Sequence, residues 1–270
     1  MSALEGLADC HRRWSDYASA IPLAQRALSI AQHVGSDRAV NIALKLARWY
    51  AETGDLSGAE RHVAAAKEEA AEHVDQALRT ACADGRADLL LLADGLEDEA
   101  LEVAGAAHAA AQRQRSPVIQ LQAQTTRCMA YLRLGDLDGA DDAIERADRY
   151  RREGRSLVVL ALRALVAALS GHTAEADRRF ERLRCEATGR HRRDPRDVGA
   201  LQFLGYARCW TALTDNTALS EAADYFRKAR WQTEPAAPGV EERLAYLVRR
   251  LEECHRRSGR LRPVLDAITG

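Results

Sequence analysis

The residue types that most often carry catalysis or bind metals are scattered along this chain. It has six cysteines, and no two of them are closer than 24 positions, so no paired-cysteine metal or redox motif is present. The eight histidines do not form the HExxH pattern of zinc enzymes, and the GxSxG, GxxxxGK(S/T) and GxGxxG patterns of hydrolases and nucleotide-binding proteins are also missing. We therefore expect a non-enzymatic protein without a cofactor or a bound metal.

Two kinds of charged cluster resemble sites at first sight. A Cys-His-Arg-Arg string occurs at Cys10–Arg13 and again at Cys254–Arg257. Neighbouring residues of a helix point to different sides, so we interpret both strings as cations at helix ends, where the helix dipole favours positive charge. The acidic groups Glu97–Glu99 and Asp136–Asp142 are interpreted as capping residues at helix starts, for the converse reason.

The densest positive charge lies in ATGRHRRDPRD, from Ala187 to Asp197, which we interpret as the longest linker of the chain. Its basic side chains are Arg190, His191, Arg192, Arg193 and Arg196. No aromatic residue lies nearby to stack on nucleic-acid bases. A solvated linker and a contact with phosphates or an acidic partner are both open, and nucleic-acid contact through residues 190–196 is the alternative function.

Composition favours helices. Of the 270 residues, 47% are hydrophobic but only 5% aromatic, and alanine dominates, together with leucine, arginine and glutamate. With 39 basic and 40 acidic residues, the net charge of −1 is unlike that of a general nucleic-acid binder. The N-terminus lacks a signal-peptide core, and no apolar run is long enough to span a membrane. We expect an all-α cytoplasmic protein with reduced thiols.

One pattern recurs along the chain. Small or apolar residues fall 5, 9 and 12 positions after each of four glycines, a spacing that places them on one face of a helix. The glycines are Gly54, Gly95, Gly135 and Gly171, separated by 41, 40 and 36 residues. Each glycine breaks a helix, and the pattern predicts two antiparallel helices joined by a tight turn, which must stack on further pairs to bury their apolar faces.

Looser copies extend the pattern to both ends. Breaks are expected at Ser15–Tyr17, Thr214–Thr217 and Ser258–Gly259, and linkers at Gly35–Asp37, Ser116–Pro117, Gly154–Ser156 and Pro235–Gly239. We expect one continuous solenoid over residues 1–270 without a second domain. Its approximate units are 1–34, 37–73, 75–114, 117–153, 156–188, 197–233 and 239–270.

The unit at Leu46–Ala66 resembles the tetratricopeptide repeat (TPR). Leu46, Ala47, Tyr50, Gly54, Asp55, Ala59 and Ala66 match that family's pattern. The family's usual period is 34, and the longer spacing here resembles the repeats of MalT-like bacterial regulators and related signal-transduction ATPases. The resemblance implies a right-handed α-solenoid of about seven helix pairs, in which the first helix of each pair lines an inner groove.

The groove is the expected binding site. Projecting the helical register onto it selects Leu44, Arg48, Leu89, Met129, Arg133, Tyr206 and Trp210. We expect an apolar centre flanked by arginines, with aromatic anchors at one end, suited to a protein, a peptide or a small apolar inducer. The same residues would instead be inter-helix core if the projection is off by one position.

The resemblance implies the sensor or interaction domain of a larger bacterial signalling or transcription-regulatory protein. A fragment of such a protein and a free-standing adaptor are both compatible with the sequence.

Overall fold

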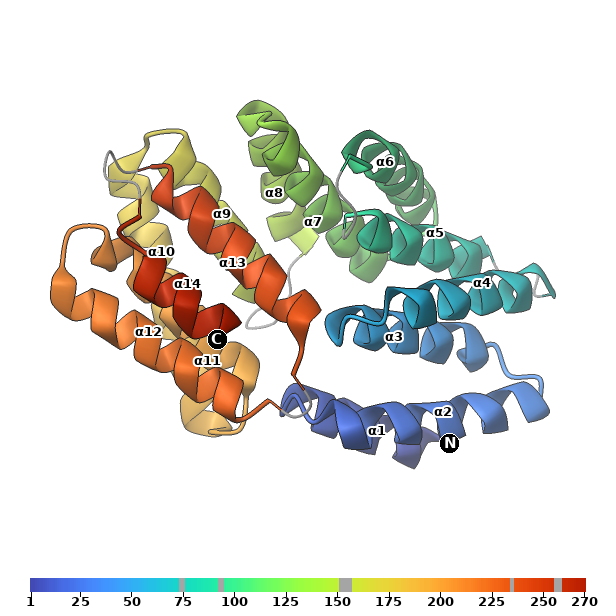
Figure 1. Cartoon of the computed structure of the whole chain (residues 1–270). Coiled ribbons are helices and arrows are strands. Elements are labelled where there is room, and N and C mark those ends of the chain that lie inside the picture. Colours follow the sequence, from blue (N-terminus) through green and yellow to red (C-terminus); the bar gives the residue numbers. More distant parts are fainter. Residues whose placement is uncertain (73–75, 92–94, 151–156, 234–235, 255–258) are drawn as a thin grey trace. The chain divides into compact units, whose positions relative to one another are not determined.

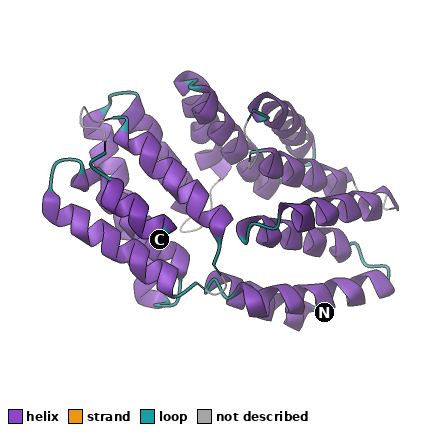
Figure 2. Cartoon of the chain, viewed as in Figure 1, coloured by secondary structure: helices purple, strands orange, loops and turns teal. Residues whose placement is uncertain are grey.

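The computed structural model describes all residues except 73–75, 92–94, 151–156, 234–235 and 255–258. The regular elements of these described residues are α-helices connected by short turns (Figures 1 and 2). In order they are α1 Ser2–Arg13, α2 Tyr17–His33, α3 Arg38–Glu52, α4 Leu56–Glu72, α5 Gln76–Leu90, α6 Glu97–Arg113, α7 Pro117–Leu134, α8 Leu137–Tyr150, α9 Leu157–Leu169, α10 Thr173–Arg193, α11 Val198–Ala212, α12 Asn216–Trp231, α13 Pro238–Glu252 and α14 Arg262–Thr269. The all-α prediction is confirmed.

The turns inside the pairs form where the glycine pattern predicts them. Gly54, Gly95, Gly135 and Gly171 have φ values of +85°, +82°, +77° and +75°. This left-handed conformation ends a helix and is strained for residues that carry a Cβ, which is why glycine recurs there. Ser15 occupies the corresponding place between α1 and α2 with φ of +57°.

A second glycine fixes the start of two second helices. Asp136 Oδ1 accepts a hydrogen bond from the Gly139 backbone N–H at 2.9 Å, and Asp55 accepts one from Gly58 in the same way at 2.7 Å. A Cβ on Gly139 would lie 2.6 Å from the Asp136 carboxylate and 2.7 Å from the ring of Tyr131. The glycine therefore allows the capping aspartate and the tyrosine to meet at the turn.

Gly139→Ala is expected to lower the free energy of unfolding by about 1–3 kcal/mol, because the new methyl group displaces the cap or the tyrosine. Gly105→Ala, in the middle of α6, is the matched control: a Cβ there would meet nothing within 4 Å. That control should raise stability by about 0.5–1 kcal/mol, since alanine loses less backbone entropy on folding. Urea unfolding of the two variants checks both signs, and equal effects would contradict the argument.

The small faces of the second helices are buried as the spacing predicts. Ala59, Ala100, Ala140 and Ala176, each five positions after a turn glycine, are fully buried. Alanine lets the two backbones of a pair approach closely, and larger residues such as Ile144 fill the seam to the next pair.

The chain divides into two compact units. Unit 1 comprises Met1–Arg12 and Tyr17–Arg151, and unit 2 comprises Arg13–Asp16 and Arg152–Gly270. In unit 1 each helix from α2 to α8 packs on the next, while α3 also packs on α5 and α5 on α7. In unit 2 the helices from α9 to α12 pack in sequence, and α14 packs on α12 and α13. One continuous solenoid across both units stays a prediction.

The predicted linker from Ala187 to Asp197 is wrong over most of its length, because α10 continues to Arg193. Thr188 and Arg193 hydrogen-bond to backbone carbonyls four residues earlier, and the cations of the last turn favour a helix C-terminus. The break expected at Gly154–Ser156 lies outside the described residues. No helix in the described ranges is long and apolar enough to cross a membrane.

Candidate functional site

The first helices α3, α5 and α7 meet one another along one side of unit 1, which we call the first-helix face. Among the described residues, α3 packs on α5 and α5 packs on α7. The second helices of successive pairs, α4 and α6 or α6 and α8, pack on each other less closely than these first helices do. The sequence predicts a binding groove on the side formed by the first helices, and this assignment stays a prediction.

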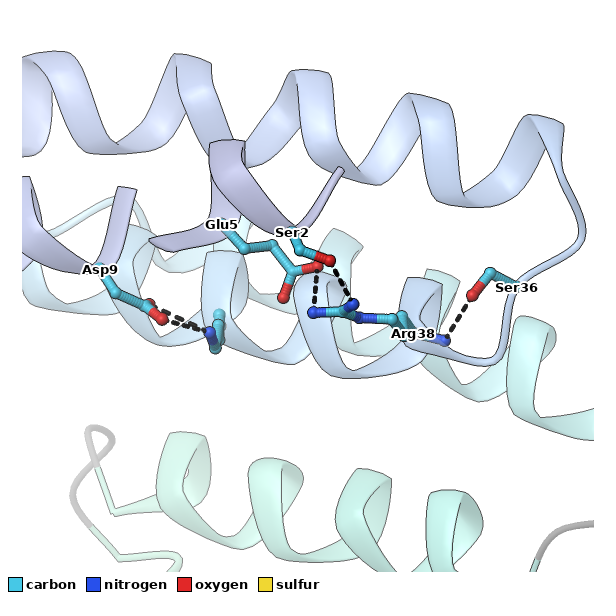
Figure 3. A network of polar contacts seen from close by, with 6 residues as sticks. Ser2, Glu5, Asp9, Ser36 and Arg38 are labelled. Carbon is cyan, nitrogen blue, oxygen red and sulfur yellow. Dashed lines mark hydrogen bonds and ion pairs between the residues drawn. The ribbon is translucent and has the colours of Figure 1, made fainter. Parts of the chain in front are cut away.

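Helix α1 is joined to α3 by polar contacts (Figure 3). Arg38 donates a hydrogen bond to Ser2 Oγ at 2.8 Å and forms an ion pair with Glu5 at 3.0 Å. One turn further along α1 and two turns further along α3, Lys45 Nζ lies 2.7 Å from the Asp9 carboxylate. These side chains are partly exposed, so the pairs set the register of two helices and contribute little to stability.

Glu52, at the end of α3, forms the buried contact of this series. It is only 4% exposed. Arg12 donates to both of its carboxylate oxygens, at 2.6 and 2.7 Å, and the Tyr17 hydroxyl donates at 3.1 Å. The Arg12 guanidinium also lies 5.3 Å from the centre of the Tyr17 ring. This fork-shaped charged contact ties α1, α2 and α3 together.

Asp88 of α5 connects α3 to α7. Arg48 of α3 pairs with its Oδ2 at 2.9 Å, and the Thr126 hydroxyl of α7 donates to its Oδ1. The side chains of Arg48 and Asp88 are 45% and 35% exposed. Solvent and a ligand can therefore reach this ion pair.

Asp84 lies one turn before Asp88 on the same side of α5 and is 3% exposed. Its Oδ1 has no hydrogen-bond partner in the described part of the chain. Burial, and secondarily the charge of Asp88, raise the Asp84 pKa well above its usual range, and Arg48 opposes the shift. Two carboxyl groups thus share one guanidinium, which leaves Asp84 poorly compensated.

Leu44 and Arg48 lie at the seam between α3 and α5, beside this site. A Cβ on Gly85 would be 3.0 Å from Leu44, so the two helices approach closely there. Leu89 is half-buried on α5. The structure brings Leu44 and Arg48 to the first-helix face, and the binding role of all three predicted residues stays a prediction.

Met129 and Arg133 make contacts with neighbouring helices. Met129 packs on the buried cluster of Leu91, Ala100 and Ala130, at the seam between α5, α6 and α7. Arg133 lies 3.7 Å from Glu97, and both side chains are only 15% exposed. Charged side chains also occur on the first-helix face, and the binding role of the half-buried Met129 and of Arg133 stays a prediction.

Tyr206 and Trp210 of α11 belong to unit 2. Tyr206 is fully buried, and the Phe180 ring of α10 lies 5.7 Å from it. Trp210 stacks on Phe180 at 5.2 Å and donates a hydrogen bond to Asp177 at 2.6 Å. Tyr206 is therefore a core residue here rather than an anchor in an open groove, because α10 covers it.

Arg190 to Arg193 belong to the last turn of α10, and the side chains of Arg192, Arg193 and Arg196 are exposed. Arg190 is half-buried, and this burial lowers its pKa. Arg193 donates to the Gly189 carbonyl at 3.0 Å, and Arg196 lies 5.2 Å from the centre of the Trp14 ring. These contacts occur within unit 2.

The projection missed Asp84 and Asp88, although the repeat itself carries a signal. These aspartates lie 11 and 7 residues before Gly95. The residues at the same distances before Gly54 are Ala43 and Ala47, both buried. A carboxylate that replaces alanine at a packing position is not explained by packing.

Comparisons with known proteins bear on the fold. No family model and no curated protein matches the sequence. A tetratricopeptide repeat protein from Parabacteroides merdae aligns over 100% of this chain and 98% of its own, with 15% identity and a TM-score of 0.42. A signal transduction ATPase with numerous domains (STAND) and a tetratricopeptide repeat sensor, from Pyrococcus horikoshii, aligns over 98% of this chain with 16% identity and a TM-score of 0.52. The chain spans 41% of that protein. By its fold, the chain is a TPR-like α-solenoid.

Proposed function

We propose that the chain is a non-enzymatic scaffold that binds a protein or peptide segment along the first-helix face of unit 1. The partly exposed Arg48–Asp88 pair beside buried Asp84 is the observation that carries this proposal. Such a pair can exchange its partner for a ligand group at little cost, because both side chains are already near solvent.

Charge indicates which ligand group suits the site. Arg48 forms an ion pair with Asp88, and Arg12 forms one with Glu52, whereas the buried Asp84 Oδ1 has no hydrogen-bond partner among the described residues. An additional cation would compensate the poorly satisfied carboxyl of Asp84. We therefore expect the partner to present a lysine or arginine side chain to Asp84 and Asp88.

A sensor role within a larger signalling protein is the second candidate. It is supported by the likeness in fold to the STAND protein, whose repeat region is described as a sensor. In such an arrangement the first-helix face would receive the signal-bearing partner.

Selection from a displayed library of random peptides on the full chain tests the proposal. Selected peptides should be enriched in lysine and arginine, and Asp88→Asn should weaken their binding about tenfold, which corresponds to about 1.4 kcal/mol. Asparagine retains an acceptor for the Thr126 hydroxyl, so the variant keeps the contact between α5 and α7. Fluorescence anisotropy of labelled peptides gives the affinities.

Glu60→Gln, on the exposed surface of α4, is the matched control and should leave affinity unchanged. A photo-crosslinking residue at position 89 should capture the peptides, and the same residue at exposed position 106 of α6 should not. Peptides that crosslink at position 106 and bind Asp88→Asn normally would contradict the proposal.

A further inference from the structure

Helix α7 carries polar residues where the equivalent helix α3 carries core residues. Counting back 15, 11 and 8 positions from the turn glycines Gly54 and Gly135 aligns the two helices. The α3 residues are the buried Ala39, Ala43 and Leu46, and the α7 residues are Gln120, Gln124 and Arg127. Since the two repeats share one architecture, the difference calls for an explanation other than packing.

Gln120 and Gln124 face α6. Gln120 Nε2 donates to the Ala111 carbonyl at 3.1 Å, which fixes the register between these antiparallel helices. One turn further along, the same register places His108 of α6 opposite Gln124. His108 is 6% exposed and Gln124 is fully buried. Among the described residues, both ring nitrogens of His108 lack a hydrogen-bond partner, and so does Gln124 Nε2.

Arg127 adds a poorly compensated charge beside these groups. It is half-buried, lies 3.4 Å from Gln124 Oε1, and donates to the Tyr131 hydroxyl at 3.2 Å. Its guanidinium also lies 5.7 Å from the centre of the Tyr131 ring. Within the described ranges no carboxylate forms an ion pair with it. A half-buried arginine without an acidic partner is unusual, because burying an uncompensated charge is costly.

Helix α8 completes the cluster. The Tyr150 ring is 6.3 Å from that of His108, and Arg146, which is paired with Asp142 at 2.9 Å, is 43% exposed. The cluster therefore extends from a buried end at Gln124 to a solvent-exposed end at Arg146.

We propose that the α6–α7–α8 cluster of His108, Gln124 and Arg127 binds a small oxyanion, such as a carboxylate or a sulfate-like group. Arg127 supplies the charge, and the N–H groups of Gln124 and His108 supply hydrogen bonds that the protein itself leaves unmade. The proposal is independent of peptide binding at the first-helix face.

Oxyanion binding would couple to the protonation of His108. Burial first, and then Arg127 of α7 and Arg146 of α8, lower the His108 pKa. From α5, Arg86 is paired with Glu99, more than two turns away along α6. A bound anion would offset the arginines and raise the His108 pKa, so binding should strengthen as the pH falls.

NMR titration of the histidine Cε1–H signals of the full chain tests this coupling. Sulfate and acetate are added separately below about 20 mM, where the general stabilising effect of sulfate is small, against chloride at matched ionic strength. We expect either oxyanion, but not chloride, to raise the His108 pKa, with about three- to tenfold tighter binding at pH 5.5 than at pH 7.5. His62, whose pKa is also lowered by burial, is the internal control and should not respond.

The two arms distinguish the ligand's shape: a response to acetate alone indicates a planar carboxylate, and a response to sulfate alone indicates a tetrahedral anion. His108→Gln identifies the signal. Arg127→Leu should abolish the response and still fold, because Leu46 fills the equivalent position in α3. Arg86→Leu should respond like the wild type. If neither oxyanion raises the His108 pKa of the wild type, the proposal is wrong, and buried water satisfies the cluster instead. An unchanged response in Arg127→Leu would also overturn the proposal.

Discussion

Replacing Glu52 with alanine is expected to lower the free energy of unfolding of unit 1 by about 2–4 kcal/mol. This is the largest loss of stability that we expect from a single substitution on the first-helix face. Glu52 is 4% exposed and accepts hydrogen bonds from Arg12 and Tyr17, so its removal takes the carboxylate away from two donors at once. The expected value is below that of a fully buried pair because the Arg12 side chain is 30% exposed.

Urea unfolding followed by circular dichroism measures this loss. Asp9→Ala removes the exposed partner of Lys45 on the same pair of helices and should change stability by no more than about 0.5 kcal/mol. The double variant Arg12→Met/Glu52→Leu should recover much of the stability, because two apolar side chains replace a charge pair instead of breaking it. Equal losses for Glu52→Ala and Asp9→Ala would show that Glu52 does not hold α1, α2 and α3 together.

The fold was predictable because its determinants are local. A turn that needs left-handed backbone selects glycine at Gly54 and Gly135, and a closely packed helix pair selects alanine at Ala59 and Ala140. Both requirements recur at the repeat spacing. The end of α10 was not predictable in this way, because an arginine-rich segment suits a solvated linker as well as a last helical turn.

The site was only partly predictable, because it depends on contacts between repeats. Helical periodicity selected Leu44 and Arg48, which contact residues of α5, and Met129, which packs on a buried cluster while remaining partly exposed; the groove itself stays a prediction. A one-position change of register rotates a side chain by about 100° around the helix. The prediction for Tyr206 was wrong for another reason. Phe180 of α10 packs against Tyr206, and the periodicity of α11 alone cannot predict a contact with another helix.

A signal for the polar contacts was nevertheless present. Arg12 and Glu52, and also Arg48 and Asp88, are separated by 40 residues, which is one repeat. Lys45 and Asp9 are separated by 36. Opposite charges one period apart on successive first helices therefore predict contacts across the stack, and this criterion would have selected Asp88 from the sequence.

Asp84→Asn is the second prediction with a large effect, and here stability is expected to rise. The Asp84 pKa is raised in the folded protein, so the folded state binds more protons than the unfolded state at pH values between the ordinary value of 3.8 and the raised one. The stabilising contribution of the protonated group is complete below pH 3.8 and is lost as the pH rises through the folded-state pKa. Asparagine does not ionise, so the variant should exceed the wild type by about 1–3 kcal/mol at pH 7.5, with the difference closing towards pH 4.

Urea unfolding of both proteins at pH 4 and pH 7.5 measures the difference, with Asp9→Asn as the exposed control. If the variant is less stable than the wild type at pH 7.5, the Asp84 carboxylate is better compensated than its missing hydrogen-bond partner indicates. A variant that is more stable and also binds the selected basic peptides more weakly would identify Asp84 as a residue whose charge destabilises the fold and serves binding. That combination separates function from packing, because a purely structural residue does not gain stability while losing a ligand.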